Sequence, residues 1–271
     1  MCVTGCEQAV REALTRRGFF RGAAAAGFAA SPCLAVEAPR RSFTKAIDLT
    51  HTMSADFPTF FGRPGIEMQR DFEFRRDRFN LFSWRVSEHV GTHLDAPIHF
   101  SEAGLTADQL PIDALVVPLA VVDAVYKAEQ DADYLLSAED LALWEGQHGR
   151  LPAGCCVALH SGWGELAASD PARFIGRDVS GTLHFPGFSP EAADWMLKER
   201  EVAGIAVDTL SLDNGASKEF KTHRLWLPSG RWGLENVANL DKVPASGATL
   251  VVGASKVKGA TGGLARLIAL V

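Results

Sequence analysis

Five apolar runs limit what this chain can fold into, because several of them are apolar at consecutive rather than alternate positions. β-Branched residues are frequent in them, which favours strands over helices. Side chains alternate between the two faces of a strand, so such runs predict strands that are covered on both faces. The runs are Leu115–Tyr126, Cys155–Trp163, Val202–Leu212, Ala248–Val257 and Ala265–Val271.

Two helices are predicted between the apolar runs. Ser137 can cap one helix, with Asp140 completing a capping box and Gly149 following its end. Ser189, Pro190 and Glu191 are typical of the start of the other. With 271 residues, 47% of them apolar, and no repeats, the chain can bury one large core. We therefore expect a single α/β domain, residues 39–271, with a mixed, barrel-like β-sheet flanked by a few helices.

The first 38 residues resemble a twin-arginine signal peptide. Arg16 and Arg17 precede two phenylalanines and an Ala/Gly-rich run, Gly22–Ala30, which is far shorter than the ~20 apolar residues of a membrane-spanning helix. An amphipathic helix is the alternative, but the segment lacks a helical apolar stripe. We expect recognition by the twin-arginine export machinery, cleavage after Ala35 or Ala38, and a periplasmic mature protein without a membrane anchor.

Composition excludes some partners and a disulfide framework. The formal net charge is −6 and no basic stripe is present, which argues against nucleic acid as a partner. Only Cys155 and Cys156 lie beyond the leader. They are adjacent in an apolar run, where a disulfide would be strained, so we expect buried free thiols.

The segment "HVGTHLDAPIHF" concentrates polar groups that suit a metal site. On a strand, His89, His93 and Asp95 share one face. The two histidines would lie ~13 Å apart along a straight strand, so the chain should bend, and Gly91 allows this at low cost. Pro97 then ends the strand and can turn His99 back. Imidazole and carboxylate ligands suit Zn²⁺ or Mn²⁺, and three protein ligands leave a position open for water.

This segment resembles the HxGTHxDxPxHF signature of the cyclase family, which includes bacterial kynurenine formamidases and isatin hydrolases. The similarity extends to "KAIDLTHTM", "GIAVDTLSLD" and "THRLWLPSGRWGLENVANLDKVP". The resemblance implies a swivelling β/β/α-like fold, a small-molecule substrate and a homodimer.

The resemblance also implies roles for single residues. His89, His93 and Asp95 match the ligands of one divalent metal, Zn²⁺ or Mn²⁺. His223 and Glu235 match the ligands of a second ion that Asp95 also touches, although isatin hydrolases use a single Mn²⁺, so one or two ions are expected. His99 matches the residue that donates and accepts protons.

An aromatic side chain near the N-terminus lines the substrate pocket in relatives, and the candidates here are Phe57, Phe60 and Phe61. Asp208 and Asp213 flank "TLSL" and are candidates to orient a ligand or the substrate.

We therefore expect a metal-dependent hydrolase that cleaves an amide, cyclic amide or imide with metal-activated water. Export favours an environmental cyclic amide, imide or lactone over N-formylkynurenine. The alternatives are an arylformamidase, a lactone hydrolase, a polyketide-type cyclase and an exported metal-binding protein without activity. A binding protein would have no need of His99.

Overall fold

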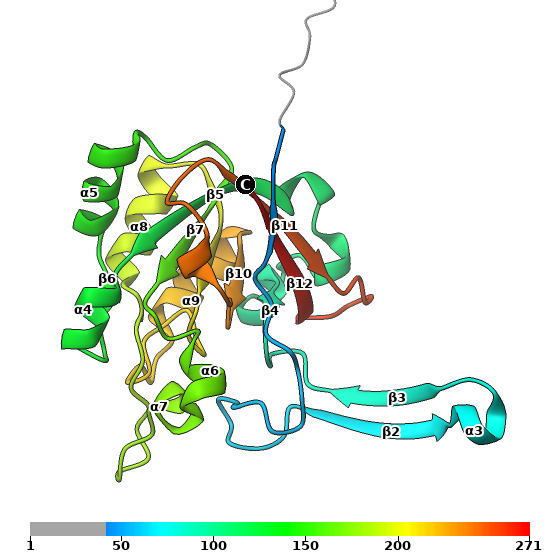
Figure 1. Ribbon diagram of the computed structural model, residues 1–271. Coiled ribbons are helices and arrows are strands. Elements are labelled where there is room, and N and C mark those ends of the chain that lie inside the picture. Colours follow the sequence, from blue (N-terminus) through cyan, green and yellow to red (C-terminus); the bar gives the residue numbers. More distant parts are fainter. Residues whose placement is uncertain (1–41) are drawn as a thin grey trace, which may run out of the picture. The chain divides into compact units, whose positions relative to one another are not determined.

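Seven strands close into a mixed β-barrel in the computed structural model, which describes residues 42–271 (Figure 1). The predicted signal peptide lies outside the described residues. Neighbouring strands β5, β7, β9 and β10 run parallel, and the other pairs are antiparallel. In spatial order the strands are β12 (Gly262–Leu270), β11 (Ala248–Ala254), β5 (Val116–Asp123), β7 (Cys155–His160), β9 (Val202–Val207), β10 (Trp232–Glu235) and β4 (His93–Asp95).

The barrel closes because β12 is long enough to pair with two strands along the same edge. Its first residues, Gly262–Leu264, pair with β4, and its last, Ile268–Leu270, pair with β1 (Ala46–Asp48). Segments from the start and the end of the described chain therefore meet along β12.

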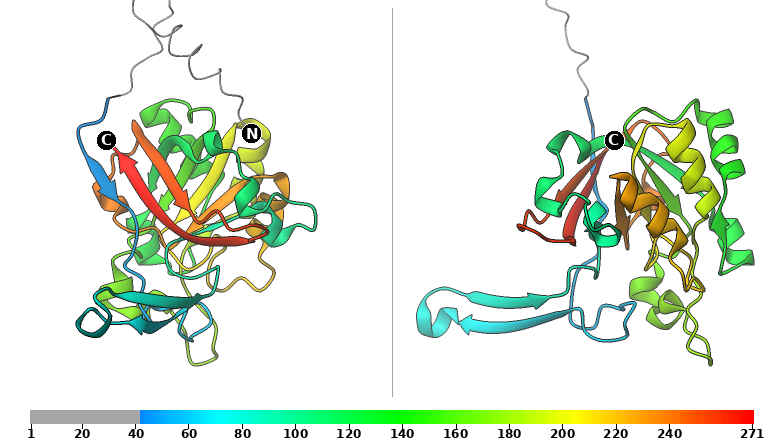
Figure 2. Two further views of the ribbon diagram at one scale, coloured as in Figure 1. Left: turned by 90° about the vertical axis from the view of Figure 1, so that its right-hand side faces the viewer. Right: turned by 180° about the vertical axis from the view of Figure 1, so that it is seen from behind.

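The apolar runs do form strands that are buried on both faces, as predicted. In β5, Val117, Leu119 and Val121 belong to one buried cluster, whereas Ala120 and Val122 belong to another. The second cluster contains side chains of α5 (Ala138–His148), α8 (Pro190–Glu199) and α9 (Lys221–Trp226). These helices thus cover the outer face of the sheet, as Figure 2 shows for the side of α8 and α9.

Both predicted helix starts are confirmed. Ser137 Oγ accepts a hydrogen bond from Asp140 N, and the Asp140 carboxylate accepts one from Ser137 N, which completes the capping box of α5. Ser189 Oγ accepts from Ala192 N at the start of α8. Cys155 and Cys156 are free and buried.

Four of the predicted strands run too far at their carboxyl ends, and one of them, β11, stops at Ala254. β5 stops at Asp123 and α4 (Val125–Gln130) follows, β7 stops at His160, and β9 stops at Val207. Apolar residues continue beyond the ends of β7 and β9 because the loops there are also buried: Trp163 and Leu210 belong to a third apolar cluster. Hydrophobicity alone therefore does not mark where a buried strand ends.

The remaining elements are short and lie outside the barrel. No helix among residues 42–271 is both long and apolar enough to cross a bilayer. The elements are β2 (Ile66–Phe72), α3 (Phe74–Asp77), β3 (Leu81–Val86), η1 (Pro97–Phe100), η2 (Ala107–Gln109), η3 (Ile112–Ala114), β6 (Leu135–Leu136), α6 (Leu166–Ser169), α7 (Pro171–Ile175), β8 (Gly187–Phe188), η4 (Leu227–Ser229) and η5 (Leu240–Lys242).

Candidate metal centre

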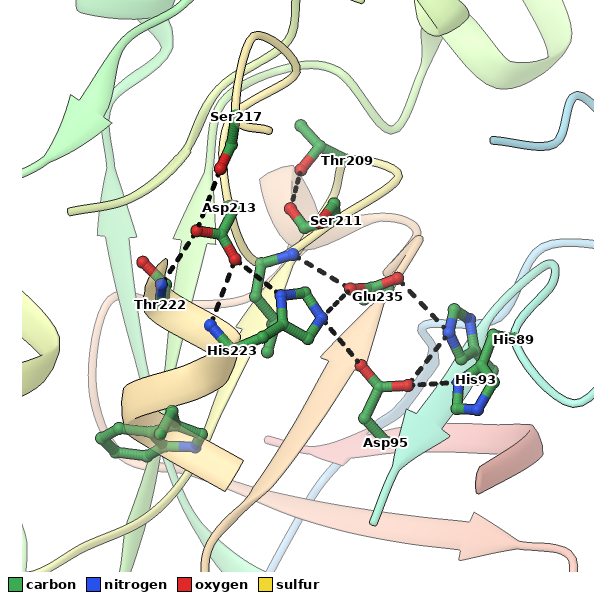
Figure 3. Close-up of polar contacts among 12 residues, drawn as sticks. His89, His93, Asp95, Thr209, Ser211, Asp213, Ser217, Thr222, His223 and Glu235 are labelled. Atoms are coloured by element: carbon green, nitrogen blue, oxygen red, sulfur yellow. Dashed lines mark hydrogen bonds and ion pairs between the residues drawn. The ribbon is translucent and has the colours of Figure 1, made fainter. Parts of the chain in front are cut away.

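Two paired strands bring three of the predicted ligands together. His93 is directly opposite Glu235 in the β4–β10 pair, and Asp95 lies two residues along β4, on the same face. His93 Nε2 lies 3.3 Å from Asp95 Oδ1 and 3.3 Å from Glu235 Oε2 (Figure 3). All three side chains are buried, and their ligand atoms lie within 4.8 Å of one another.

The chain bends at Gly91, as the spacing predicted, but the strand does not run through the motif. β3 ends at Val86 and β4 begins at His93, so His89 lies in the connecting loop. Gly91 has φ +57°, and its carbonyl oxygen accepts from His93 Nδ1 at 2.8 Å. Glycine adopts this left-handed backbone conformation without strain, and the resulting bend folds His89 back towards Asp95.

His99 lies where the turn after Pro97 was expected to put it. Pro97–Phe100 forms a 3₁₀ turn, and the His99 ring stacks on His89 with centroids 3.7 Å apart. One ring nitrogen of His99 lies within 4.8 Å of a ring nitrogen of His89 and of a carboxylate oxygen of Asp95. Burial lowers the pKa of His99 to about 4 in the absence of a metal. By geometry alone, His99 can carry a proton or complete a ligand set.

His223 comes from a separate segment, the first turn of α9. Its Nε2 lies 3.1 Å from Glu235 Oε1 and 3.5 Å from Asp95 Oδ2. Asp213 sets this position: its carboxylate accepts from Thr222 N (2.9 Å), His223 N (3.1 Å) and His223 Nδ1 (2.7 Å). Asp213 therefore caps α9 and orients the imidazole that α9 carries.

His89 is held by Glu88 and Thr261, a pair that no sequence pattern indicated. Thr261 donates its hydroxyl hydrogen to Glu88, so its oxygen accepts from His89 Nε2 at 2.8 Å. Thr261 directly precedes β12 in a glycine-rich segment. A Cβ on Gly262 would come 2.6 Å from His89 Cε1, so the glycine makes room for the ring. Only the β12–β4 pairing brings these residues together.

The three imidazoles share one arrangement of donor and acceptor atoms. Each N–H bonds a supporting acceptor: Thr261 for His89, the Gly91 carbonyl for His93 and Asp213 for His223. In the neutral ring the second nitrogen then carries a lone pair. In all three rings that nitrogen faces Asp95 or Glu235, and for His89 it lies 2.6 Å from Asp95 Oδ1 (Figure 3).

These ring nitrogens and the carboxylate oxygens that they face are all hydrogen-bond acceptors, so a cation is required between them. His93 Nε2 and Asp95 Oδ2 are buried and have no hydrogen-bond partner. Burial alone would lower the pKa of His93, but the carboxylates of Asp95 and Glu235 outweigh it and raise the pKa to about 10. The pKa of His223 is raised for the same reason, so without a metal the site draws protons onto His93 and His223. Three imidazoles and two carboxylates are a donor set that fits a divalent metal ion.

The three candidate substrate-binding phenylalanines lie in different environments. Phe57 packs in an apolar cluster against Phe174, and Phe61 is 62% exposed. Phe60 approaches the site through Phe220: the Phe60–Phe220 ring centroids are 6.3 Å apart, and the Phe220–His223 centroids 5.9 Å. Phe60 and Phe61 also line a pocket of about 420 Å³.

Two further aromatic rings, those of Phe100 and Phe220, flank the same side of the site. The Phe100 ring lies 4.8 Å from that of His223 and 6.0 Å from that of Phe220. Phe100 ends the histidine motif, but Phe220 adjoins it only because α9 packs there. We call Phe60, Phe100 and Phe220 the aromatic wall.

An Asp213→Asn variant should separate orientation of His223 from simple packing. The amide keeps the size of the side chain but removes the charge that orients the His223 Nδ1–H. We expect metal affinity to fall by about 10–100-fold, the usual cost of losing such a supporting group. Isothermal titration with Zn²⁺ or Mn²⁺ measures this. Unchanged affinity in a folded variant would show that Asp213 only caps α9.

Comparison with known proteins agrees with this fold. The Cyclase family model matches residues 47–214, more than half of the chain. An isatin hydrolase from Roseibium aggregatum is 34% identical over 219 residues, which cover 77% of this chain and 82% of that protein. A kynurenine formamidase from Bordetella petrii is 28% identical over 193 residues, or 70% of this chain and 81% of the relative.

Solved structures show the same architecture. Isatin hydrolase A from Labrenzia aggregata, bound to benzyl benzoate, superposes with a TM-score of 0.78 at 31% identity, covering 84% of this chain and 93% of that one. An isatin hydrolase bound to the product analogue thioisatinate also gives 0.78, at 30% identity, covering 84% and 92%. The fold and these relatives thus identify the protein as a hydrolase built on a mixed β-barrel. The chain belongs to the Cyclase family.

Proposed function

We propose that this protein hydrolyses a cyclic amide with the help of a bound divalent metal ion. One observation carries the proposal: the imidazoles of His93 and His223, which are buried, and of His89, which is half-buried, each direct a ring nitrogen at the buried carboxylates of Asp95 and Glu235. Such an arrangement is costly without a cation and is stable with one.

The ligands in this proposal are His89, His93, Asp95, His223 and Glu235. Asp95 lies between two groups, with Oδ1 towards His89 and His93 and Oδ2 towards His223, so it can serve one ion or bridge two. The donor set suits Zn²⁺ and Mn²⁺ alike. When bound, such an ion polarises a carbonyl oxygen and lowers the pKa of water so that hydroxide is available at neutral pH.

His99 moves the proton in this proposal. It lies at the half-buried edge of the site, against His89 and 6.2 Å (ring centroids) from His223, within reach of the space between the ligands. Its imidazole accepts the proton of the attacking water and delivers it to the departing amide nitrogen. Asp213 and the Glu88–Thr261 dyad hold the neighbouring rings while this happens.

The substrate class follows from the relatives and from the aromatic wall. The isatin hydrolase from Roseibium aggregatum is 34% identical to this chain over 219 residues, against 28% over 193 residues for the kynurenine formamidase from Bordetella petrii. Phe60, Phe100 and Phe220 offer ring faces on which a planar aromatic amide can stack. We therefore place isatin-like cyclic amides first and N-formylkynurenine second, since the formamidase relatives support that activity.

A substrate panel tests this order. The purified protein, loaded with Mn²⁺ or with Zn²⁺, is assayed on isatin, a cyclic imide, a lactone and N-formylkynurenine. We expect the highest kcat/KM on isatin or the imide. Higher efficiency on N-formylkynurenine would make the protein an arylformamidase. No hydrolysis of any compound by the metal-loaded protein would favour a metal-binding protein without activity.

We further propose that the protein is exported by the twin-arginine machinery and works in the periplasm. Arg16 and Arg17, followed by a short Ala/Gly-rich run, support this. Fractionation of cells that carry an Arg16→Lys/Arg17→Lys variant tests it. The mature protein should disappear from the periplasm, and normal export of the variant would refute the route.

A further inference from the structure

A pocket of about 420 Å³ adjoins the aromatic wall. Phe60 belongs both to the wall and to the lining of the pocket. The rest of the lining comes from Phe61, from the loop after α7 and from the segment before α9 (Figure 1). A substrate that stacks on the wall, with its amide at the metal ligands, can therefore extend a substituent into the pocket.

The lining of this pocket is positively charged, although the chain as a whole has a formal net charge of −6. Arg177 and Lys218 line it, and no aspartate or glutamate of residues 42–271 does. Arg63 adds a third positive charge, since its guanidinium carbon lies 5.7 Å from the centroid of the Phe61 ring. We call this site the basic pocket.

No carboxylate neutralises the two cations of the lining. Within residues 42–271, the Arg177 guanidinium donates only to carbonyl oxygens, that of Gly181 at 3.1 Å and that of Phe60 at 3.4 Å. These bonds hold the guanidinium beside the aromatic wall and leave its charge in place. Lys218 forms no ion pair with any residue that the structure describes. Both cations are therefore available to an anion.

The acidic residues next to these cations in the sequence have other partners. Glu219 pairs with Lys221 at 3.0 Å. The Asp178 carboxylate accepts from Thr182 N at 2.9 Å and lies 3.4 Å from His184 Nε2. These contacts of Asp178 also fold the loop after α7 back on itself, so the basic pocket is formed before a ligand arrives.

We propose that the basic pocket binds a carboxylate of the substrate, carried at the end of its ring system farthest from the amide bond. This inference rests on the proposed function, because it names which cyclic amides suit the same site. A planar guanidinium such as that of Arg177 matches a carboxylate with two hydrogen bonds, and the ammonium of Lys218 adds a second charge. The protein therefore prefers aromatic cyclic amides with an acidic substituent over neutral ones.

Two substrates that differ in charge but hardly in shape test this preference. They are isatin-5-carboxylate and isatin-5-carboxamide, whose substituents lie para to the amide nitrogen. We expect kcat/KM to be at least about fivefold higher for the carboxylate, mainly through a lower KM, because exposed charge pairs contribute modestly. The preference should shrink as salt is added, since salt screens exposed charges.

A Lys218→Gln variant of the full protein removes one of the cations. The preference for the carboxylate should fall at least about threefold, while kcat/KM on the carboxamide changes less than about twofold. Lys218→Arg keeps the charge and should keep the preference. Lys198→Gln is the matched control, because Lys198 is an exposed cation that pairs with Asp194 on α8. It should leave the preference unchanged.

Direct binding separates failure of the basic pocket from failure of the proposed function. The probe is oxindole-5-carboxylate, which lacks the ketone that activates the amide, and isothermal titration should show its Kd rising at least about threefold in Lys218→Gln. Hydrolysis of both isatins with equal efficiency, and equal Kd values for the two proteins, would overturn the basic pocket and leave the proposed function intact. If neither isatin were hydrolysed but binding still depended on Lys218, the basic pocket would stand and the proposed function would fail.

Discussion

An Asp95→Asn variant is expected to purify without metal and to lose on the order of 10³-fold or more in turnover. Asp95 is the side chain that all three lone-pair nitrogens approach, at 2.6 Å for His89, 3.3 Å for His93 and 3.5 Å for His223. The amide has the same shape but offers no negative charge, and its NH₂ group would point a donor into the cation position. Losing the electrophilic contribution of the ion removes several kcal/mol of transition-state stabilisation.

The measurement pairs elemental analysis with kcat/KM on the best substrate of the panel. Asp113→Asn is the matched control, because Asp113 is an exposed aspartate on η3, away from the site. It should keep the metal content and activity of the natural protein. If Asp95→Asn also kept its metal and its activity within a few-fold, Asp95 would not be a ligand.

A His99→Ala variant is expected to keep its metal and yet lose about 10²-fold or more in kcat. The reason is that removal of a proton-transfer group slows the chemical step without removing an essential ligand. His99 stacks on His89, so a ligand role makes a different prediction: the metal would be lost as well. Metal titration and steady-state kinetics on the same preparation separate the two roles.

His148→Ala is a suitable control, since His148 ends α5 and its ring packs near Trp144 rather than at the site. Full activity of His99→Ala would contradict any catalytic role. Loss of metal from it, with normal folding, would move His99 into the ligand set.

The sequence predicts local features of this fold well and long-range ones poorly. Apolar runs such as that of β7 predict buried strands, and the Ser137 capping box predicts the start of α5, because both depend on neighbours in the chain. Closure of the barrel depends on β12 pairing with β4, nearly 170 residues earlier, and no local pattern encodes that. The hairpin of β2 and β3 was also missed as a unit, since the alternation of apolar and polar residues in it resembles that of an ordinary sheet strand.

The same division applies to the site. His89, His93, Asp95 and His99 lie in one segment, so their spacing predicts a bend at Gly91, which the structure contains. The grouping of His223 and Glu235 with them was expected only from family resemblance, and the structure brings them to within 3.5 Å of Asp95 or His93. No sequence pattern indicates that Thr261 supports His89, because a threonine before two glycines is typical of a turn.

The metal content of the natural protein tests the central claim most directly. Elemental analysis of protein purified from its native compartment should find one or two equivalents of a divalent metal per chain. Removal by a chelator should abolish hydrolysis, and Zn²⁺ or Mn²⁺ should restore it. Full activity in protein that contains no metal before or after chelation would contradict the account.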